Sequence, residues 1–314
     1  MGFFWKLQKV SAGRGIRQGL VDSAISVLHC ACEAEAELCS IATVGDIGST
    51  QKVMKKEKVS ILNSQGLKLV GELEDTGSKD LCVLCHGFQS SKELPTFVSV
   101  SKALTESGFS TYRFDFTGNG ESNGEFAYGN YWREAEDIRS VVNYWRYRGW
   151  RVISLIGHSK GGNAVLLYAS KYKDVASIVN ISGRFDLRRG IKGRLGGSKG
   201  VQKLKEDGVL DVYDRNGNFE FRVLKSDLDE RLATDMHKAC LAIPEHCSVL
   251  NVHGSADEIV PAEDVHEFGK RIRNNVVHVI DGADHNYKLQ QQEIARLVAD
   301  FVRSIPRPPL RASL

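Results

Sequence analysis

The residue of this sequence best suited to chemistry is Ser159. It stands in the pattern Gly-x-Ser-x-Gly formed by residues 157–161, between the apolar run 152–156 and the helix-like segment 160–172. A serine on a tight turn from a strand into a helix has its hydroxyl pushed out of the sheet, and small residues two positions before and after it allow that turn. The pattern therefore predicts a nucleophile at Ser159.

A serine hydroxyl is a weak nucleophile and needs a base, which a histidine can supply. His285 directly follows the predicted strand 276–280. Because the carboxyl ends of parallel strands meet at one edge of a sheet, His285 is expected on the same edge as Ser159.

The base in turn needs a carboxylate that orients it and stabilises its charged form. Asp257 follows the predicted strand 248–252, and Glu258 and Asp264 are alternatives nearby. With Asp257, the chain order is serine, aspartate, histidine, which is one of the known orders of such a triad.

Residues 86–89, His-Gly-Phe-Gln, follow the predicted strand 81–85 and suit an oxyanion hole. The backbone N–H groups of Phe88 and Lys160 are the predicted donors, and losing one such donor typically costs ~3–4 kcal/mol of transition-state stabilisation. Acyl transfer of this kind needs no metal and no organic cofactor.

The elements that must position these residues alternate between strands and helices. Such alternation predicts an α/β fold with a mostly parallel sheet flanked by helices on both faces. Strands are predicted at residues 59–62, 67–73, 81–85, 110–116, 152–156, 176–181, 248–252 and 276–280, and helices at 95–107, 131–147, 160–172, 262–273 and 288–303.

Residues 183–245 interrupt this alternation and are interpreted as a cap inserted over the carboxyl edge of the sheet. Residues 214–218, Asp-Arg-Asn-Gly-Asn, are a strong hairpin-turn signal. Residues 187–205 hold seven basic residues, five glycines and no acidic residue. The basic segment 188–205 is expected to be a solvated, mobile loop, with an anion-attracting rim as the alternative.

Composition narrows the class of protein. The chain has 314 residues, 42% hydrophobic and 26% charged, which excludes a disordered protein. With 42 basic and 39 acidic residues the net charge is +3, too balanced to indicate nucleic acid as the main partner. The seven cysteines are expected to be reduced thiols of an intracellular protein. Cys82 and Cys85 should point to opposite faces of one strand.

Several other polar residues in these motifs are expected to have structural and not catalytic or ligand-binding roles. The glycine-rich segment 115–122 resembles a phosphate loop but lacks the Lys-Ser/Thr ending. The segment is therefore not expected to bind a nucleotide. Asp115 ends a predicted strand and is expected to be a structural hydrogen-bonding residue and not a base. Structural or supporting roles are also expected for His86, His158 and His253.

The two ends of the chain bear on localisation. Residues 1–56 form a leader of uncertain order without a secretory signal, and the apolar stretch 20–32 is interrupted by charge and is no membrane span. A cytoplasmic protein is expected. Plastid or mitochondrial import through the acid-free first 21 residues is one alternative, and peroxisomal import through the Ala-Ser-Leu end of the tail 306–314 is another. The oligomeric state stays open.

Five motifs together resemble the α/β-hydrolase superfamily, over about residues 57–305. The resemblance is strongest to the serine aminopeptidase (S33)-like group that includes cinnamoyl and feruloyl esterases. The motifs are His86-Gly87-Phe88, the segment 115–122, the segment 157–162, the segment 253–261 and Gly282-Ala283-Asp284-His285, with a further likeness in the hairpin 214–221.

The resemblance implies Ser159 as nucleophile, Asp257 as acid, His285 as base, and the amides of Phe88 and Lys160 as the oxyanion hole. Lys160 departs from the Gln or Met expected in many relatives, and its charge is expected to influence which acyl or leaving groups are tolerated.

The function expected is hydrolysis of a small-molecule carboxylic ester with a small or medium acyl group, an aromatic one being implied by the resemblance alone. An aminopeptidase and a monoacylglycerol-type lipase are alternatives. The basic, glycine-rich segment makes the lipase less attractive. A non-catalytic ligand receptor on the same fold is the alternative of another class.

Overall fold

The computed structural model describes residues 54–307. Most of the leader 1–56 lies outside the described residues, as do the tripeptide 312–314 and the cysteines Cys30, Cys32 and Cys39. Among the described residues, no helix combines the length and the apolar character needed to cross a lipid bilayer.

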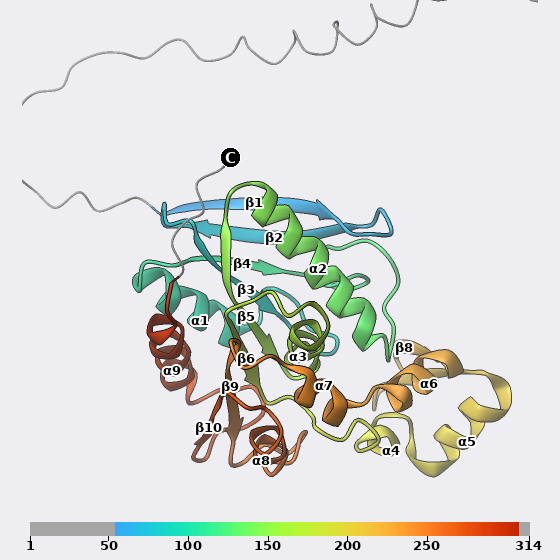
Figure 1. The fold of residues 1–314 in the computed structure, drawn as a ribbon. Helices are drawn as coiled ribbons and strands as arrows, with labels where there is room; N and C mark the ends of the chain where they lie inside the picture. The colour runs from blue at the N-terminus through green and yellow to red at the C-terminus, as the bar shows by residue number, and fades with distance from the viewer. Residues whose placement is uncertain (1–53, 308–314) are drawn as a thin grey trace, which may run out of the picture. The chain divides into compact units, whose positions relative to one another are not determined.

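A sheet of eight strands runs through the described part of the chain (Figure 1). Its strand order is β1-β2-β4-β3-β5-β6-β9-β10, with β1 and β2 antiparallel at one edge and parallel pairing from β4 to β10. This architecture confirms the predicted α/β class. The strands are β1 (Lys55–Leu62), β2 (Lys68–Asp75), β3 (Asp80–Cys85), β4 (Ser110–Phe114), β5 (Arg151–His158), β6 (Ser177–Ile181), β9 (Ser248–Gly254) and β10 (Asn275–Ile280).

Helices cover both faces of the sheet, and each face has its own apolar core. Helices α1 (Pro95–Glu106) and α9 (Gln291–Ser304) pack on one face with Cys82. The other face carries Cys85 and the helices α2 (Tyr131–Tyr147), α3 (Lys160–Tyr172), α7 (Met236–Ala242) and α8 (Asp264–Gly269). Cys82 and Cys85 therefore point to opposite faces, as the strand period of two predicts, and both are free thiols.

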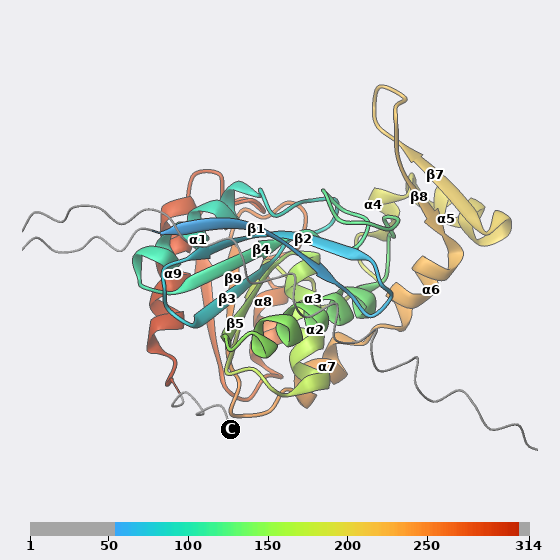
Figure 2. The ribbon, with the colours of Figure 1, turned by 90° about the horizontal axis from the view of Figure 1, so that it is seen from above.

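Between β6 and α7 the chain builds a separate layer that projects beyond the sheet (Figure 2). Its elements are α4 (Ile191–Arg194), α5 (Gly197–Asp207), the antiparallel hairpin of β7 (Val209–Tyr213) and β8 (Phe219–Leu224), and α6 (Lys225–Ala233). A third apolar cluster joins this layer to the body, because Leu204 and Phe221 pack with Tyr128 and Phe88.

The expectation that the basic segment 188–205 is a mobile loop is wrong. The segment forms α4 and most of α5, and Leu195 and Leu204 are buried in the third cluster. Two of its glycines, Gly190 with φ 77° and Gly196 with φ 71°, directly precede α4 and α5 and allow the left-handed backbone at the start of each helix.

Two predicted helices have other bounds. Helix α9 begins at Gln291 and not at residue 288, because Tyr287 has φ 55° and the Lys288 N–H is bound by the Asp284 carboxylate at 3.0 Å. Helix α8 is shorter than the predicted 262–273 and ends at Gly269, where the backbone comes so close to Val277 that a Cβ would lie 2.6 Å from its side chain.

Candidate active site

Ser159 lies on a strained turn between β5 and α3. Its φ and ψ are 56° and −119°, and its N–H donates to Ile181 O at 2.7 Å. A non-glycine residue in this region costs roughly 1–3 kcal/mol and is found where function requires it. Glycines make the turn possible, since a Cβ at Gly157 would lie 2.1 Å from Gly161 O and one at Gly161 would lie 2.0 Å from Cys85 O.

His285 and Asp257 meet at the same edge of the sheet. The two side chains follow β10 and β9, and His285 Nδ1 lies 2.7 Å from Asp257 Oδ2. The other carboxylate oxygen accepts the N–H groups of Ile259 and Val260, both at 2.8 Å. The Asp257 side chain is fully buried and that of His285 is 11% exposed, so the pair is largely shielded from water.

The two alternative carboxylates are engaged elsewhere. Asp264 accepts the Phe185 N–H at 2.9 Å and forms an ion pair with Arg189 at 3.3 Å. Glu258 is exposed and makes no hydrogen bond to His285 among residues 54–307. Of the three carboxylates predicted from the sequence, it is Asp257 that the structure joins to the histidine.

His253, at the end of β9, supports Asp257 from the opposite side. Its Nε2 lies 3.1 Å from Asp257 Oδ2 and 3.1 Å from Val260 O. Burial by itself raises the pKa of the Asp257 carboxyl, but the hydrogen bonds from His253 and His285 outweigh burial and hold that pKa well below its usual range. The i,i+4 spacing of His253 and Asp257 across the strand end is the sequence signal that could have singled out this supporting role.

His158 ties the turn of Ser159 to the loop of His285. Its Nε2 donates to His285 O at 2.8 Å, and the two imidazole rings lie 4.9 Å apart between centroids. Burial, together with the charge of His285, lowers the pKa of His158 to about 3, so this ring is neutral at physiological pH. The Ser159 hydroxyl makes no hydrogen bond with any of residues 54–307. Hydrogen bonds between catalytic groups are commonly long or absent without substrate and form only around it.

The segment 86–89 presses against the turn of Ser159. A Cβ on Gly87 would lie 3.0 Å from Ser159 Cβ, so the two backbones are in close approach. His86 anchors the segment: its Nε2 accepts the Phe116 N–H at 3.0 Å and its Nδ1 donates to Gly87 O at 2.8 Å. Burial lowers the pKa of His86 to about 4, which keeps the ring neutral for both contacts.

The backbone N–H groups predicted to form an oxyanion hole have no hydrogen-bond partner within the described part of the chain. Neither the N–H of Phe88 nor that of Lys160 forms a backbone hydrogen bond within the described part of the chain. Both residues line the cavity that Ser159 lines. The two N–H groups are thus free to donate to a bound oxygen.

Asp115 and its glycine-rich segment hold the neighbouring loop together. The carboxylate accepts the N–H groups of Lys92 at 2.7 Å and Glu121 at 3.0 Å, and it pairs with Lys92 Nζ at 2.8 Å. It is fully buried within this network and takes the structural role expected of it.

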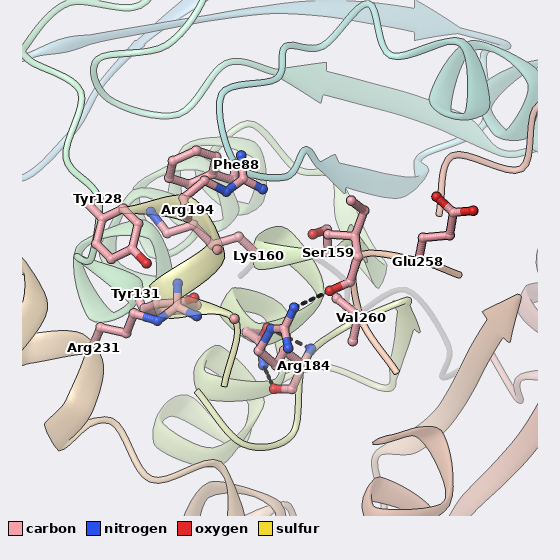
Figure 3. A pocket seen from close by; sticks show the side chains of 14 residues that line it. Phe88, Tyr128, Tyr131, Ser159, Lys160, Arg184, Arg194, Arg231, Glu258 and Val260 are labelled. Carbon is pink, nitrogen blue, oxygen red and sulfur yellow. Dashed lines mark hydrogen bonds between the residues drawn. The ribbon is translucent and has the colours of Figure 1, made fainter. Parts of the chain in front are cut away.

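A cavity of about 500 Å³ opens beside Ser159 (Figure 3). Aromatic residues from the body and cationic residues from several elements line it, among them Phe88, Tyr128, Tyr131 and Lys160. The Lys160 ammonium is paired with the buried Glu134 carboxylate at 2.7 Å, so its charge is neutralised within the protein. The described residues contain no group of three or more His, Cys, Asp or Glu side chains that could hold a metal ion.

Comparison with known proteins agrees with this architecture. The family model described as serine aminopeptidase, S33 matches residues 76–208. The chain is 27% identical over 226 residues to an uncharacterised Saccharomyces cerevisiae protein, YDL057W, covering 66% of this chain and 68% of that protein. An uncharacterised 31.7 kDa Escherichia coli protein is 36% identical over 124 residues, which are 37% of this chain and 42% of that protein.

Solved structures share the fold. Est1E of Butyrivibrio proteoclasticus, solved with ferulic acid, has a TM-score of 0.68 at 24% identity, covering 78% of this chain and 98% of that one. The Pyrococcus furiosus esterase Pf2001 has a TM-score of 0.62 at 20% identity, covering 85% and 99%. The chain therefore has the α/β-hydrolase fold of these structures, and residues 76–208 resemble the serine aminopeptidase, S33 family.

Proposed function

We propose that the protein is a serine hydrolase that cleaves a carboxylic ester through an acyl-enzyme. The observation that carries the proposal is the 2.7 Å hydrogen bond between His285 and Asp257, at the sheet edge where Ser159 occupies its strained turn. The match to a hydrolase family and the esterases among the structural neighbours support it.

In this mechanism Ser159 Oγ attacks the ester carbonyl carbon while His285 Nε2 takes the hydroxyl proton. Asp257 holds the imidazole through Nδ1 and stabilises its charged form. The amides of Phe88 and Lys160 donate to the oxyanion of the tetrahedral intermediate.

The intermediate then collapses. His285 returns its proton to the departing alcohol, which leaves the acyl group on Ser159. A water molecule, deprotonated by His285, attacks the acyl carbon and releases the carboxylic acid, and the proton passes back to Ser159. Ester and water are consumed, and acid and alcohol are formed.

Peptide hydrolysis is less well supported. An aminopeptidase must bind a free α-ammonium group, and a carboxylate is the partner that such a cation requires. Glu258 is the one acidic residue that lines the cavity within the described residues, against the guanidinium groups of Arg184, Arg194 and Arg231. The charge of the cavity therefore disfavours an aminopeptidase.

The test is a panel of 4-nitrophenyl esters with acyl chains of two to eight carbons, assayed with the wild type and with Ser159→Ala. We expect hydrolysis by the wild type and a loss of at least about 10³-fold in kcat for Ser159→Ala. A folded wild type that hydrolyses no ester and is not modified by a fluorophosphonate would overturn the proposal in favour of a non-catalytic ligand receptor.

A further inference from the structure

Three guanidinium groups line the Ser159 cavity without a carboxylate partner. Arg184 follows β6, Arg194 ends α4 and Arg231 lies in α6. No carboxylate oxygen among residues 54–307 lies within 4.0 Å of a nitrogen of any of the three. Because they come from separate elements, it is the fold, and not the local sequence, that gathers these cations around one space (Figure 3).

Their contacts leave the charges in place. Arg231 donates through Nε to Leu187 O at 2.8 Å and through Nη2 to Arg189 O at 3.0 Å. Arg184 donates to Ile259 O, and Arg194 rests over the Phe88 ring at 4.5 Å. Carbonyl oxygens and a ring face satisfy donors, but they do not neutralise a cation.

The acids near the cavity do not neutralise the three charges either. Glu134 is paired with Lys160, and Asp264 is engaged by the Phe185 N–H and Arg189. Glu258 lines the cavity but forms no ion pair with any of the three arginines among residues 54–307. Burial, together with the charge of Arg231, lowers the pKa of Arg184, as expected where two cations face each other across a partly buried space.

A buried hydroxyl also lacks a partner in this cavity. Tyr128 is 1% exposed, and its hydroxyl forms no hydrogen bond within the described residues. Burial raises the pKa of this phenol, while the charges of Arg231, Arg194 and Arg184 oppose the rise, so the field of all three cations reaches Tyr128. A buried donor without an acceptor is costly to the fold and becomes favourable once a bound group accepts from it.

We propose, resting on the serine hydrolase function above, that the substrate is an ester carrying a second, negatively charged oxygen group, either a carboxylate or a phosphate. Arg184, Arg194 and Arg231 bind this anionic group, and the Tyr128 hydroxyl donates to it. Guanidinium groups present paired N–H donors that match the oxygens of both anions. Of the seven basic residues in the segment 188–205, Arg194 is the one that lines this cavity, so the anion-attracting role belongs to one cation of that segment.

The first experiment compares esters matched in shape and different in charge. The 4-nitrophenyl monoester of adipic acid carries a free carboxylate at the far end of its acyl chain. The 4-nitrophenyl ester of adipic acid monoamide carries a neutral carboxamide of the same size at that position. The 4-nitrophenyl ester of 5-phosphonopentanoic acid carries a phosphonate there, in place of a phosphate. We expect kcat/KM for at least one anionic ester to exceed that for the amide by about tenfold or more, and the advantage to shrink in high salt. The better of the two anionic esters identifies the anion, and equal values for all three esters overturn the proposal.

Variants test which residues supply the preference. Arg194→Gln is the primary variant, because Arg194 is exposed and makes no hydrogen bond within residues 54–307. Arg184→Gln is the second. Each variant should lower kcat/KM for the anionic ester about tenfold. The kcat/KM for the ester that carries the carboxamide should stay within about twofold of the wild-type value. Arg222→Gln, on the hairpin and paired with Asp211, is the matched control and should change neither. Equal losses on both esters in the cavity variants would contradict a charge-reading role.

Binding to Ser159→Ala separates this proposal from the hydrolase proposal. Adipate and inorganic phosphate are titrated into Ser159→Ala and into Ser159→Ala/Arg194→Gln while the thermal midpoint is recorded. A midpoint that rises with anion in the first protein and not in the second supports the anion subsite even if no ester is cleaved. Ester cleavage without charge preference and without such a rise leaves the hydrolase proposal standing and overturns this one.

Discussion

His253 and His285 approach the same oxygen of Asp257, with His253 Nε2 at 3.1 Å and His285 Nδ1 at 2.7 Å from Oδ2. One carboxylate oxygen thus serves two imidazoles, of which His285 is the proposed base. In the proposed mechanism His253 is therefore a positioning residue, because it would act on the reaction through Asp257.

Replacing His253 tests this positioning role. His253→Phe keeps a ring of similar size and removes the hydrogen bond to Asp257. We expect kcat to fall about tenfold with little change in KM. The acidic limb of the pH–rate profile should also move to higher pH, because Asp257 then interacts more strongly with the charged form of His285. A purely structural residue would lower the thermal midpoint without moving that limb.

Asp257→Asn should affect both catalysis and the pH dependence of stability. The side-chain amide of the introduced asparagine is neutral and stabilises charged His285 poorly. We therefore expect kcat to fall by two to four orders of magnitude, and a loss of about 10⁴-fold is typical of this substitution in a serine hydrolase triad. Because folding lowers the pKa of Asp257, its contribution to stability is present above the unfolded value of about 3.9 and is lost as the pH falls through the folded value. Urea unfolding should show the difference in unfolding free energy between wild type and variant shrinking between pH 6 and pH 3. A difference that grows as the pH falls would contradict this account.

The strain at Ser159 predicts an effect on stability. Ser159→Gly and Ser159→Ala both remove the hydroxyl, but only glycine adopts φ 56° without cost. The glycine variant should therefore be more stable than the alanine variant by about 0.5–2 kcal/mol, after allowance for its more flexible unfolded chain. Equal thermal midpoints for the two inactive variants would mean that the turn is relaxed.

The buried pair Lys160–Glu134 predicts a non-additive double mutant. Lys160→Met leaves the Glu134 carboxylate buried without its cation and should cost roughly 3 kcal/mol or more. Lys160→Met/Glu134→Gln removes both charges and should recover most of that loss. The Lys160 side chain is paired with Glu134, and the substitution retains the backbone N–H of residue 160. The double variant should therefore keep the ester preference of the wild type. A changed preference would restore the idea that the Lys160 charge selects substrates.

The sequence predicted most of what depends on strand and helix periodicity. Helices 131–147 and 160–172 have the predicted bounds, because an apolar stripe and flanking turn residues define each of them. The turn at Ser159 follows from glycines two positions away on either side.

Features that depend on long-range packing were not predictable. The local sequence of the basic segment 188–205 indicates a loop. The segment is helical because Leu195 and Leu204 pack with residues distant in the sequence, Phe221 and Tyr128. The pairing of Lys160 with Glu134 joins α3 to α2, and no local pattern indicates it. The same holds for the gathering of Arg184, Arg194 and Arg231 around one cavity.

The most direct test of the central claim is to follow fluorophosphonate labelling of the purified chain and map the adduct by mass spectrometry. A single adduct on Ser159 is expected, formed at least about 100-fold faster in the wild type than in a folded His285→Ala variant. An adduct on another residue, or equal labelling rates with and without the imidazole, would contradict it.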